Sequence, residues 1–190
     1  MTWLARLRAY GAHGDPAAEA ANIVALVVGW NGPFYPLYVV ALAGTQALWP
    51  SLLTMLATPF FLAAPWLSRL SSPAARFGFV LVGTLNTVWC TKLMGAASGV
   101  GLFLLPCAAL TALLFRTRER WLMWSALALP VAAYFVPDRA YGPPLMALDA
   151  QAAARLGALN AASVLMLTAF IALRFASLLR QAEAMPAPML

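Results

Sequence analysis

The sequence predicts an all-α membrane protein, a bundle of six transmembrane helices with both termini in the cytoplasm. Hydrophobic residues make up 63% of the chain and charged residues only 9%, whereas water-soluble domains carry roughly 25% charged residues. A surface so poor in charge cannot be solvated by water, so it must face lipid. The lengths of the apolar segments and the placement of the basic residues agree with this fold class.

Six apolar segments follow one another along the chain, each close to the ~20 residues that a spanning helix needs. Backbone groups in hydrocarbon must be hydrogen-bonded within the segment, so continuous apolar stretches of this length are expected to be helical and not barrel strands. The predicted spans are residues 20–44, 47–68, 75–95, 98–116, 119–137 and 155–180. They form a membrane domain, residues 19–180, between an interfacial segment, residues 1–18, and a cytoplasmic tail, residues 181–190.

The basic residues predict which way the bundle faces, because Lys and Arg favour the cytoplasmic side of a membrane. With six crossings, nine of them fall on the side of the termini: Arg6, Arg8, Arg69, Arg76, Arg116, Arg118, Arg120, Arg174 and Arg180. Only Lys92, Arg139 and Arg155 fall on the other side. The net charge of +6 is therefore interpreted as a topology signal. No nucleic-acid partner is predicted, since the basic residues are separated by apolar runs.

The first twelve residues lack the continuous apolar core of a cleaved signal peptide. Trp3, Leu4, Leu7 and Tyr10 recur at helical spacing. We expect a short amphipathic helix on the inner membrane surface, with its aromatic side chains among the headgroups. An ordinary ordered tail is the alternative.

The middle of the first span contains two prolines and two glycines that predict a kinked helix. Each proline removes one helical hydrogen bond, so Pro33 is expected to free the carbonyl of Gly29, and Pro36 that of Gly32. Irregular backbone at membrane depth is tolerated only where it is buried in protein or lines a cavity. The segment therefore predicts a ligand-binding site, with a structural kink packed by its aromatic rings as the alternative.

The third span places polar side chains at lipid depth, where such residues usually face the bundle interior. Asn86 and its neighbours either contact a ligand or hydrogen-bond another helix, with the first span as the expected partner. Asn160 and Ser163 in the sixth span leave the same two alternatives open, and Lys92 is expected to extend to the membrane surface. The predicted ligand contacts are Trp30, Asn31, Phe34, Tyr35, Tyr38, Asn86, Trp89 and Cys90.

The long connection before the sixth span, the start of that span and the two cysteines each predict how the helices pack. The connection over residues 137–149 is rich in turn-forming residues and is expected to pack over the outer end of the bundle, with Asp149 as the N-cap of the sixth helix. Ala153, Gly157 and Ala161 form a row of small residues that suits close contact within the bundle or in a dimer. Cys90 and Cys107 differ in depth by roughly 6 Å, so no disulfide is expected.

The sequence predicts no catalytic residue, no metal site and no cofactor. The one histidine, His13, lies in the N-terminal segment, and the six carboxylates lie in loops, tails or span ends. Acid–base pairs, nucleophile–base pairs and phosphate loops are missing. A non-enzymatic function is therefore expected, and a proton-coupled transporter is disfavoured because it needs ionisable groups within the membrane.

The run over residues 21–38 resembles the start of the six-helix membrane sensor of CqsS-type quorum-sensing histidine kinases, and related modules anchor some bacterial adenylate cyclases. The corresponding positions are Asn22, Gly29, Trp30, Pro36 and Tyr38. The resemblance implies a homodimeric sensor in the bacterial inner membrane that binds a small lipophilic molecule and signals through its last helix. Because the sequence shows no phospho-accepting histidine, ATP-binding region or cyclase domain, we expect the output to lie on a partner protein.

Two alternatives remain. The chain suits an accessory or scaffold subunit that docks against a larger membrane complex through lipid-facing aromatic and small residues. A channel or transporter for small solutes would be supported by an internal inverted repeat. The first three and last three spans show no convincing match, since the pattern over residues 29–38 has no counterpart in the fourth span.

Overall fold

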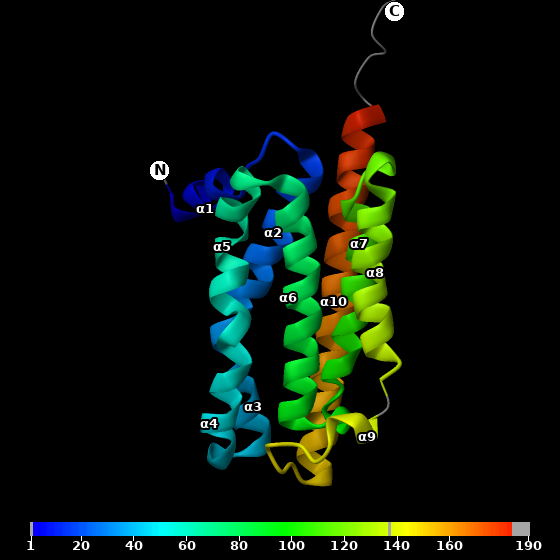
Figure 1. Ribbon diagram of the computed structural model, residues 1–190. Helices are drawn as coiled ribbons and strands as arrows, with labels where there is room; N and C mark the ends of the chain where they lie inside the picture. The colour runs from blue at the N-terminus through cyan, green and yellow to red at the C-terminus, as the bar shows by residue number, and fades with distance from the viewer. Residues whose placement is uncertain (1, 137, 184–190) are drawn as a thin grey trace, which may run out of the picture.

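The computed structural model describes residues 2–136 and 138–183, and every regular element within them is a helix (Figure 1). The predicted all-α class is confirmed. Short 3-10 helices, labelled η, lie between several of the α-helices. The N-terminal elements are α1 (Trp3–Gly11), α2 (Pro16–Asn31), η1 (Gly32–Phe34), α3 (Tyr35–Ala43), η2 (Thr45–Ala47), α4 (Leu48–Leu52), η3 (Leu53–Ala57), α5 (Thr58–Leu70) and α6 (Ser72–Met94). They are followed by η4 (Ala96–Ser98), η5 (Val100–Phe103), α7 (Leu104–Leu114), η6 (Thr117–Glu119), α8 (Arg120–Tyr134), α9 (Asp138–Tyr141) and α10 (Ala150–Glu183).

Four helical stretches within the described residues are long and apolar enough to cross a membrane: Pro16–Ala43, Thr45–Leu70, Ser72–Met94 and Ala150–Arg180. A fifth candidate is the pair Val100–Leu114 and Thr117–Tyr134, bent by 119° at the break between them. The chain therefore has four to five candidate spans by length and composition.

The predicted fourth and fifth spans correspond to shorter helices than expected. α7 holds 11 residues and α8 holds 15, fewer than the ~20 that an α-helix needs to cross the hydrocarbon core. α7 is extended at its start by η5, whose 3-10 geometry rises about 2.0 Å per residue, and it ends where Phe115 adopts an extended backbone. The two helices lie side by side in the bundle (Figure 1), and six crossings stay a prediction.

The first long helix is interrupted at the predicted position, but its carbonyl groups are not free. The Gly32 N–H donates to the carbonyls of Gly29 and Val28, and the Tyr35 N–H donates to the carbonyl of Gly32. The prediction that Pro33 and Pro36 leave two carbonyls unpaired is therefore wrong. The chain tightens into η1, and 3-10 bonds replace the α-helical bonds that the prolines remove.

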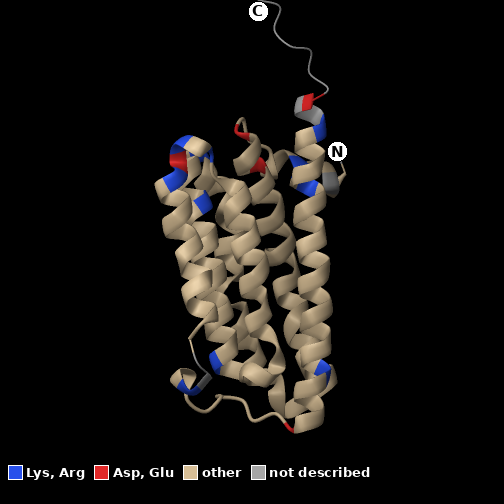
Figure 2. Ribbon diagram, turned by 90° about the vertical axis from the view of Figure 1, so that its right-hand side faces the viewer, with Lys and Arg blue, Asp and Glu red and all other residues tan. Residues whose placement is uncertain are grey.

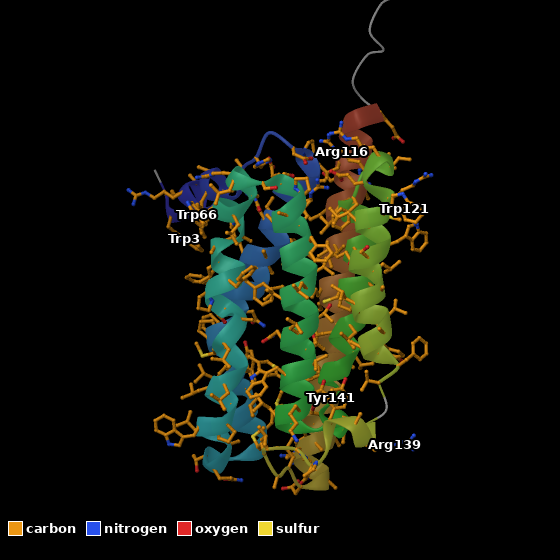
Figure 3. The ribbon with its side chains drawn as sticks, viewed as in Figure 1. Trp3, Trp66, Arg116, Trp121, Arg139 and Tyr141 are labelled. Atoms are coloured by element: carbon orange, nitrogen blue, oxygen red, sulfur yellow. The ribbon has the colours of Figure 1, made fainter. Side chains whose placement is uncertain are left out.

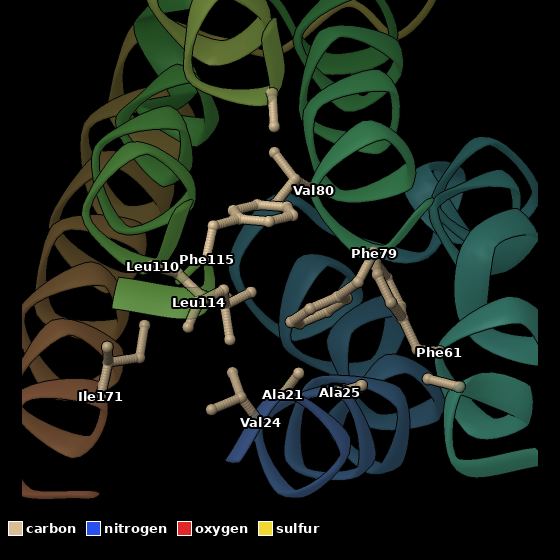
Figure 4. Close-up of a cluster of buried hydrophobic side chains, with 12 residues drawn as sticks. Ala21, Val24, Ala25, Phe61, Phe79, Val80, Leu110, Leu114, Phe115 and Ile171 are labelled. Atoms are coloured by element: carbon tan, nitrogen blue, oxygen red, sulfur yellow. The ribbon is translucent and has the colours of Figure 1, made fainter. Parts of the chain in front are cut away.

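The interior is divided into two clusters of buried apolar side chains. One cluster joins α2, α5, α6, α7, α8 and α10, with Phe61 and Phe79 in edge-to-face contact at 5.8 Å (Figure 4). The second cluster, around Val39, Leu93 and Leu156, lies toward the other end of the bundle. Large apolar side chains also cover the outside, which in a membrane protein is the surface that faces lipid.

Charged residues are concentrated at the two ends of the bundle. Figure 2 shows most Lys and Arg residues near the end that carries both termini. α1 lies across this end, where the Tyr10 hydroxyl donates to the Leu62 carbonyl (3.0 Å) and Trp3 stacks on Trp30 at 6.1 Å. Trp66 lies at the same corner as Trp3 (Figure 3) and is also exposed. The predicted N-terminal helix is thus present and docked against α2 and α5.

The connection between α8 and α10 packs over the opposite end, as predicted. Lys92 Nζ donates to the carbonyls of Tyr141 (2.7 Å) and Pro143 (2.8 Å). The expectation that Lys92 extends to the membrane surface stays a prediction, and these loop carbonyls are the partners of its ammonium group. The Asp149 carboxylate accepts from the Ala152 N–H at 2.7 Å, which confirms the predicted N-cap. The first residue of the predicted connection, residue 137, lies outside the described residues.

Candidate ligand cavity

A cavity of about 150 Å³ lies between the helices that surround the break in the first long helix. Its wall is formed by α2, η1, α3, η3, α5, α6, η5, α7 and α10. Most lining groups are apolar, among them Val28, Phe61, Phe79, Leu110 and Ile171. Engineered apolar cavities of this size admit a benzene molecule. The space is therefore large enough for a small ligand.

Glycines set how closely the helices approach around the cavity. A Cβ at Gly32 would collide with the Thr58 hydroxyl, so η1 lies directly against the start of α5. A Cβ at Gly83 would come within 3.3 Å of Cys107 Sγ. Gly83 and Cys107 both line the cavity, so the missing side chain at Gly83 leaves part of its volume open.

The structure brings four of the eight predicted ligand contacts together at this cavity. Asn31 from α2, Tyr35 from α3, and Asn86 and Cys90 from α6 all line it. These residues are distant in sequence, and Asn31 and Tyr35 are four residues apart, which places them on one helical face. Gly32, predicted as part of the helix break, also lines the cavity.

The other four predicted contacts lie outside the cavity. Trp30, Phe34 and Tyr38 are 59%, 43% and 45% exposed. Their four-residue spacing puts them on the outward face of the same helix. The Trp89 indole N–H donates to the Leu53 carbonyl (3.0 Å), which fixes α6 to η3. The expectation that one set of aromatic residues and amides surrounds a single ligand is therefore corrected, because helical periodicity divides the set between two faces.

A polar network connects the cavity wall to the last helix. The Tyr35 hydroxyl donates to Asn160 Oδ1 on α10 (3.1 Å), and Asn160 Nδ2 donates to the Ser98 carbonyl of η4 (2.8 Å). Asn160 is fully buried. Of its two predicted roles, the interhelical contact is the one observed. Ser163 instead donates to the Leu159 carbonyl within its own helix.

Asn86 differs from Asn160, because it is only partly buried and has a weaker partner. Among the residues that the structure describes, its only hydrogen-bond partner is the Cys90 thiol, with Sγ 4.0 Å from Oδ1. The expected hydrogen bond to the first span is not found in that part of the chain. Asn86 lines the cavity, and its amide nitrogen has no hydrogen-bond partner in that part of the chain. Both thiols, Cys90 and Cys107, are free.

The predicted row of small residues on α10 makes different contacts at each position. Ala153 is buried, and Gly157 lies against the backbone of Gly99, whose φ of +73° is a left-handed conformation. A side chain at Gly99 would push α10 away from the turn between α6 and α7, because its Cβ would lie 3.1 Å from Gly157 Cα. Ala161 is exposed on the outer face. Close packing within the bundle is thus observed at Gly157.

A second cluster at the arginine-rich end was missed by the sequence analysis. Arg76 is 1% exposed, and its guanidinium forms a two-fold contact with the Glu119 carboxylate at 2.9 and 3.0 Å. Asp15 lies 3.6 Å from the same guanidinium and pairs with Arg116 at 2.9 Å. The cluster connects the start of α2 to α6 and to the loop between α7 and α8. Arg76 also donates to the Leu114 carbonyl.

The charges of this cluster perturb the titration of Asp15. Burial by itself raises the pKa of this carboxyl group, but hydrogen bonds from Ser72 and Arg116 lower it. The Ala17 N–H and the positive charge of Arg76 act in the same direction. The pKa of Asp15 therefore lies below its ordinary value of 3.8. In the sequence, an acidic residue within the run of arginines over residues 116–120 was the one available sign of this cluster.

The helical stretches long and apolar enough to span a membrane, with arginines gathered at one end of the bundle, are the features of a membrane protein. The chain belongs to the MASE7 family, whose sequence model matches residues 17–187. MASE domains are membrane-associated sensor modules and are not catalytic by themselves. The predicted resemblance to a membrane sensor is therefore confirmed. Comparison with curated proteins and with solved structures gives no match.

Proposed function

We propose that this chain binds a small lipophilic ligand in the cavity and transmits its occupancy to a partner protein through α10. The observation that carries the proposal is the position of Tyr35. Its ring lines the cavity, and its hydroxyl is hydrogen-bonded to Asn160 on α10. A ligand that displaces Tyr35 would therefore change the position of α10, because the hydrogen bond joins the two helices where hydrocarbon offers no competing water.

The C-terminal end of α10 is the expected contact with the output partner. α10 has 34 residues and projects beyond the other helices at the end that carries both termini (Figure 1).

The first half of α10 has an exposed face that carries Ala154, Ala158 and Leu165. Small residues let two helices approach closely in a membrane, so this face supports the homodimer that the resemblance implies. Crosslinking in native membranes tests whether a second copy or another membrane protein covers it.

The proposed orientation has six crossings in the bacterial inner membrane, with both termini in the cytoplasm. It is supported by the arginines at the end that carries the termini and by the tendency of cytoplasmic loops to carry Lys and Arg. Reporters fused to the N- and C-terminal ends test it. Signals from opposite sides of the membrane would contradict an even number of crossings.

The ligand-binding proposal is tested with a pair of glycine substitutions on α6. Gly83→Leu places an isobutyl group into the cavity beside Cys107 Sγ, whereas Gly78→Leu meets only Phe60, 3.7 Å from the added Cβ, outside the cavity. Each protein is purified in mild detergent, and its bound small molecules are extracted and measured by mass spectrometry. We expect a molecule other than bulk phospholipid to accompany the wild type and Gly78→Leu, and to be lost from Gly83→Leu.

Two results would contradict the proposal. One is a wild-type extract that contains bulk phospholipid alone even when the cells are grown to high density. The other is an additional molecule that is retained equally by Gly83→Leu. In the second case the molecule binds elsewhere on the protein, and the cavity is a packing defect.

A further inference from the structure

We infer that the cavity selects a neutral molecule about the size of a single aromatic ring, and that Asn86 favours molecules carrying a hydroxyl or carbonyl group. This inference rests on the proposed function and names the chemical class of its ligand. It is carried by three observations: the charge of the cavity wall, its volume and the unpaired hydrogen-bonding capacity of Asn86.

The wall of the cavity excludes ions. None of the described residues that line it is Asp, Glu, Lys, Arg or His. A charged ligand would lose most of its hydration on entering and would find no opposite charge to replace it. The volume of about 150 Å³ suits one aromatic ring with a small substituent.

Asn86, which is partly buried, provides the polar selection, and it differs from the two buried asparagines, Asn22 and Asn160. Asn22 Nδ2 donates to the Gly11 carbonyl (3.1 Å) and to Ser68 Oγ (3.0 Å), so it fixes α1 and α5 to α2. Asn160 likewise has two strong partners. Asn86 has only the thiol of Cys90 within the described chain, and a thiol is a weak donor.

The amide nitrogen of Asn86 has no hydrogen-bond partner within the described chain, so it favours a ligand that supplies an acceptor. The amide of Asn86 offers both donors and an acceptor, so a ligand hydroxyl or carbonyl oxygen can pair with it in either orientation of the amide. Thr87, one residue along α6, also lines the cavity but donates to the Gly83 carbonyl at 2.9 Å. Its hydroxyl is already engaged, which makes Thr87 a matched control.

The test compares p-xylene, p-cresol and benzylammonium, which are similar in size but differ in polarity and charge. The full chain is held in lipid nanodiscs, and binding is followed by protection of Cys90 and Cys107 from N-ethylmaleimide, measured by mass spectrometry. Both cysteines line the cavity, and the chain has no others. We expect p-xylene and p-cresol to protect both thiols, and benzylammonium to protect neither.

Substitution at Asn86 then isolates the hydrogen bond. Asn86→Leu preserves the shape of the side chain and should raise the ratio of the Kd for p-cresol to that for p-xylene roughly tenfold, which equals about 1.4 kcal/mol. Thr87→Val should leave the ratio unchanged. The ratio is measured on one protein at a time, so partitioning of the probes into lipid cancels between variants. Asn86→Ala provides the same comparison if the leucine variant is poorly folded.

The possible outcomes separate this inference from the proposed function. Protection by benzylammonium would overturn the assignment of a neutral ligand. A ratio that does not change in Asn86→Leu and Asn86→Ala would overturn the role of Asn86, while continued binding of p-xylene would leave the cavity as a binding site. Failure of all three probes to protect either thiol in the wild type would overturn the ligand-binding function itself.

Discussion

In the arginine cluster at the end of the bundle, we expect removal of Glu119 and removal of Arg76 to destabilise the protein unequally. Arg76 is almost completely buried, whereas the carboxylates of Glu119 and Asp15 remain 15% and 14% exposed. Glu119→Ala leaves a buried guanidinium with only Asp15 at 3.6 Å to compensate it. Removing one partner of a buried ion pair costs ~3–5 kcal/mol, and the remaining partner places this variant near the lower end, at about 3 kcal/mol.

Arg76→Met should be much milder, at about 1 kcal/mol, because an apolar side chain of similar length suits the buried site and the carboxylates can be hydrated. Replacement of buried ion pairs by apolar residues is often neutral or stabilising. Since 1 kcal/mol corresponds to roughly 2–4 °C in a domain of this length, we expect Tm to fall by about 6–12 °C for Glu119→Ala and by about 2–4 °C for Arg76→Met.

The assay is thermal unfolding of the purified protein in one detergent, followed by circular dichroism and by the accessibility of the two cysteines. Arg118→Met is the control, because Arg118 is exposed in the same loop and forms no ion pair within the described chain. An Arg76→Met variant that is as unstable as Glu119→Ala would refute the reasoning. That result would mean that the lost contacts of Arg76, and not an uncompensated buried charge, determine the stability.

Three further predictions concern other parts of the molecule. The pKa of Asp15 is lowered in the folded state, so its contribution to stability is complete above its unfolded-state pKa of ~4. That contribution is lost as the pH falls through the lower folded-state pKa. The Tm of the wild type should therefore differ from that of Asp15→Asn at neutral pH, and the two Tm values should converge in strong acid. Trp30→Ala should leave the protection of both thiols by p-xylene unchanged, because Trp30 lies outside the cavity, and a loss of protection would contradict the placement of the site. Asn22→Leu should weaken the docking of α1, since Asn22 bonds the Gly11 carbonyl; hydrogen exchange should then accelerate in residues 3–11 and stay unchanged in α10.

Composition and the length of the apolar segments were sufficient to predict the helical class. In hydrocarbon, backbone N–H and C=O groups must be hydrogen-bonded within the protein, and a helix does this within one segment. They were insufficient for α7 and α8, whose ends depend on the backbone conformation at Phe115 and Arg116. The prolines of the first span correctly marked a break. The hydrogen bonding at that break could not be predicted from the loss of α-helical bonds at proline. The chain tightens into the 3-10 helix η1, whose hydrogen bonds pair the carbonyl groups instead.

The candidate site was predicted in part for a similar reason. The motif over residues 29–38 predicted the right segment. Helical periodicity divides its residues between two faces, so its exposed aromatic residues do not line the cavity with Asn31 and Tyr35. Phe103, Cys107 and Ile171 also line the cavity, and nothing in their local sequence distinguishes them from other apolar positions. The Arg76–Glu119 contact joins residues 43 positions apart, a separation that no local pattern specifies.

The distribution of polar contacts along α10 explains why this helix suits a transmitting role. Near the end of the bundle opposite the termini it is held by Asn160, which bonds both Tyr35 and the turn between α6 and α7. Toward the arginine-rich end, its contacts to the core are made by apolar side chains such as Phe170 and Ile171, and none of the ion pairs in the described chain includes it. Apolar contacts are not directional, so α10 can shift against the core there at little cost. A displacement of Tyr35 by a ligand would therefore be expressed at the projecting end of α10, while the ion-paired starts of α2 and α6 hold their positions.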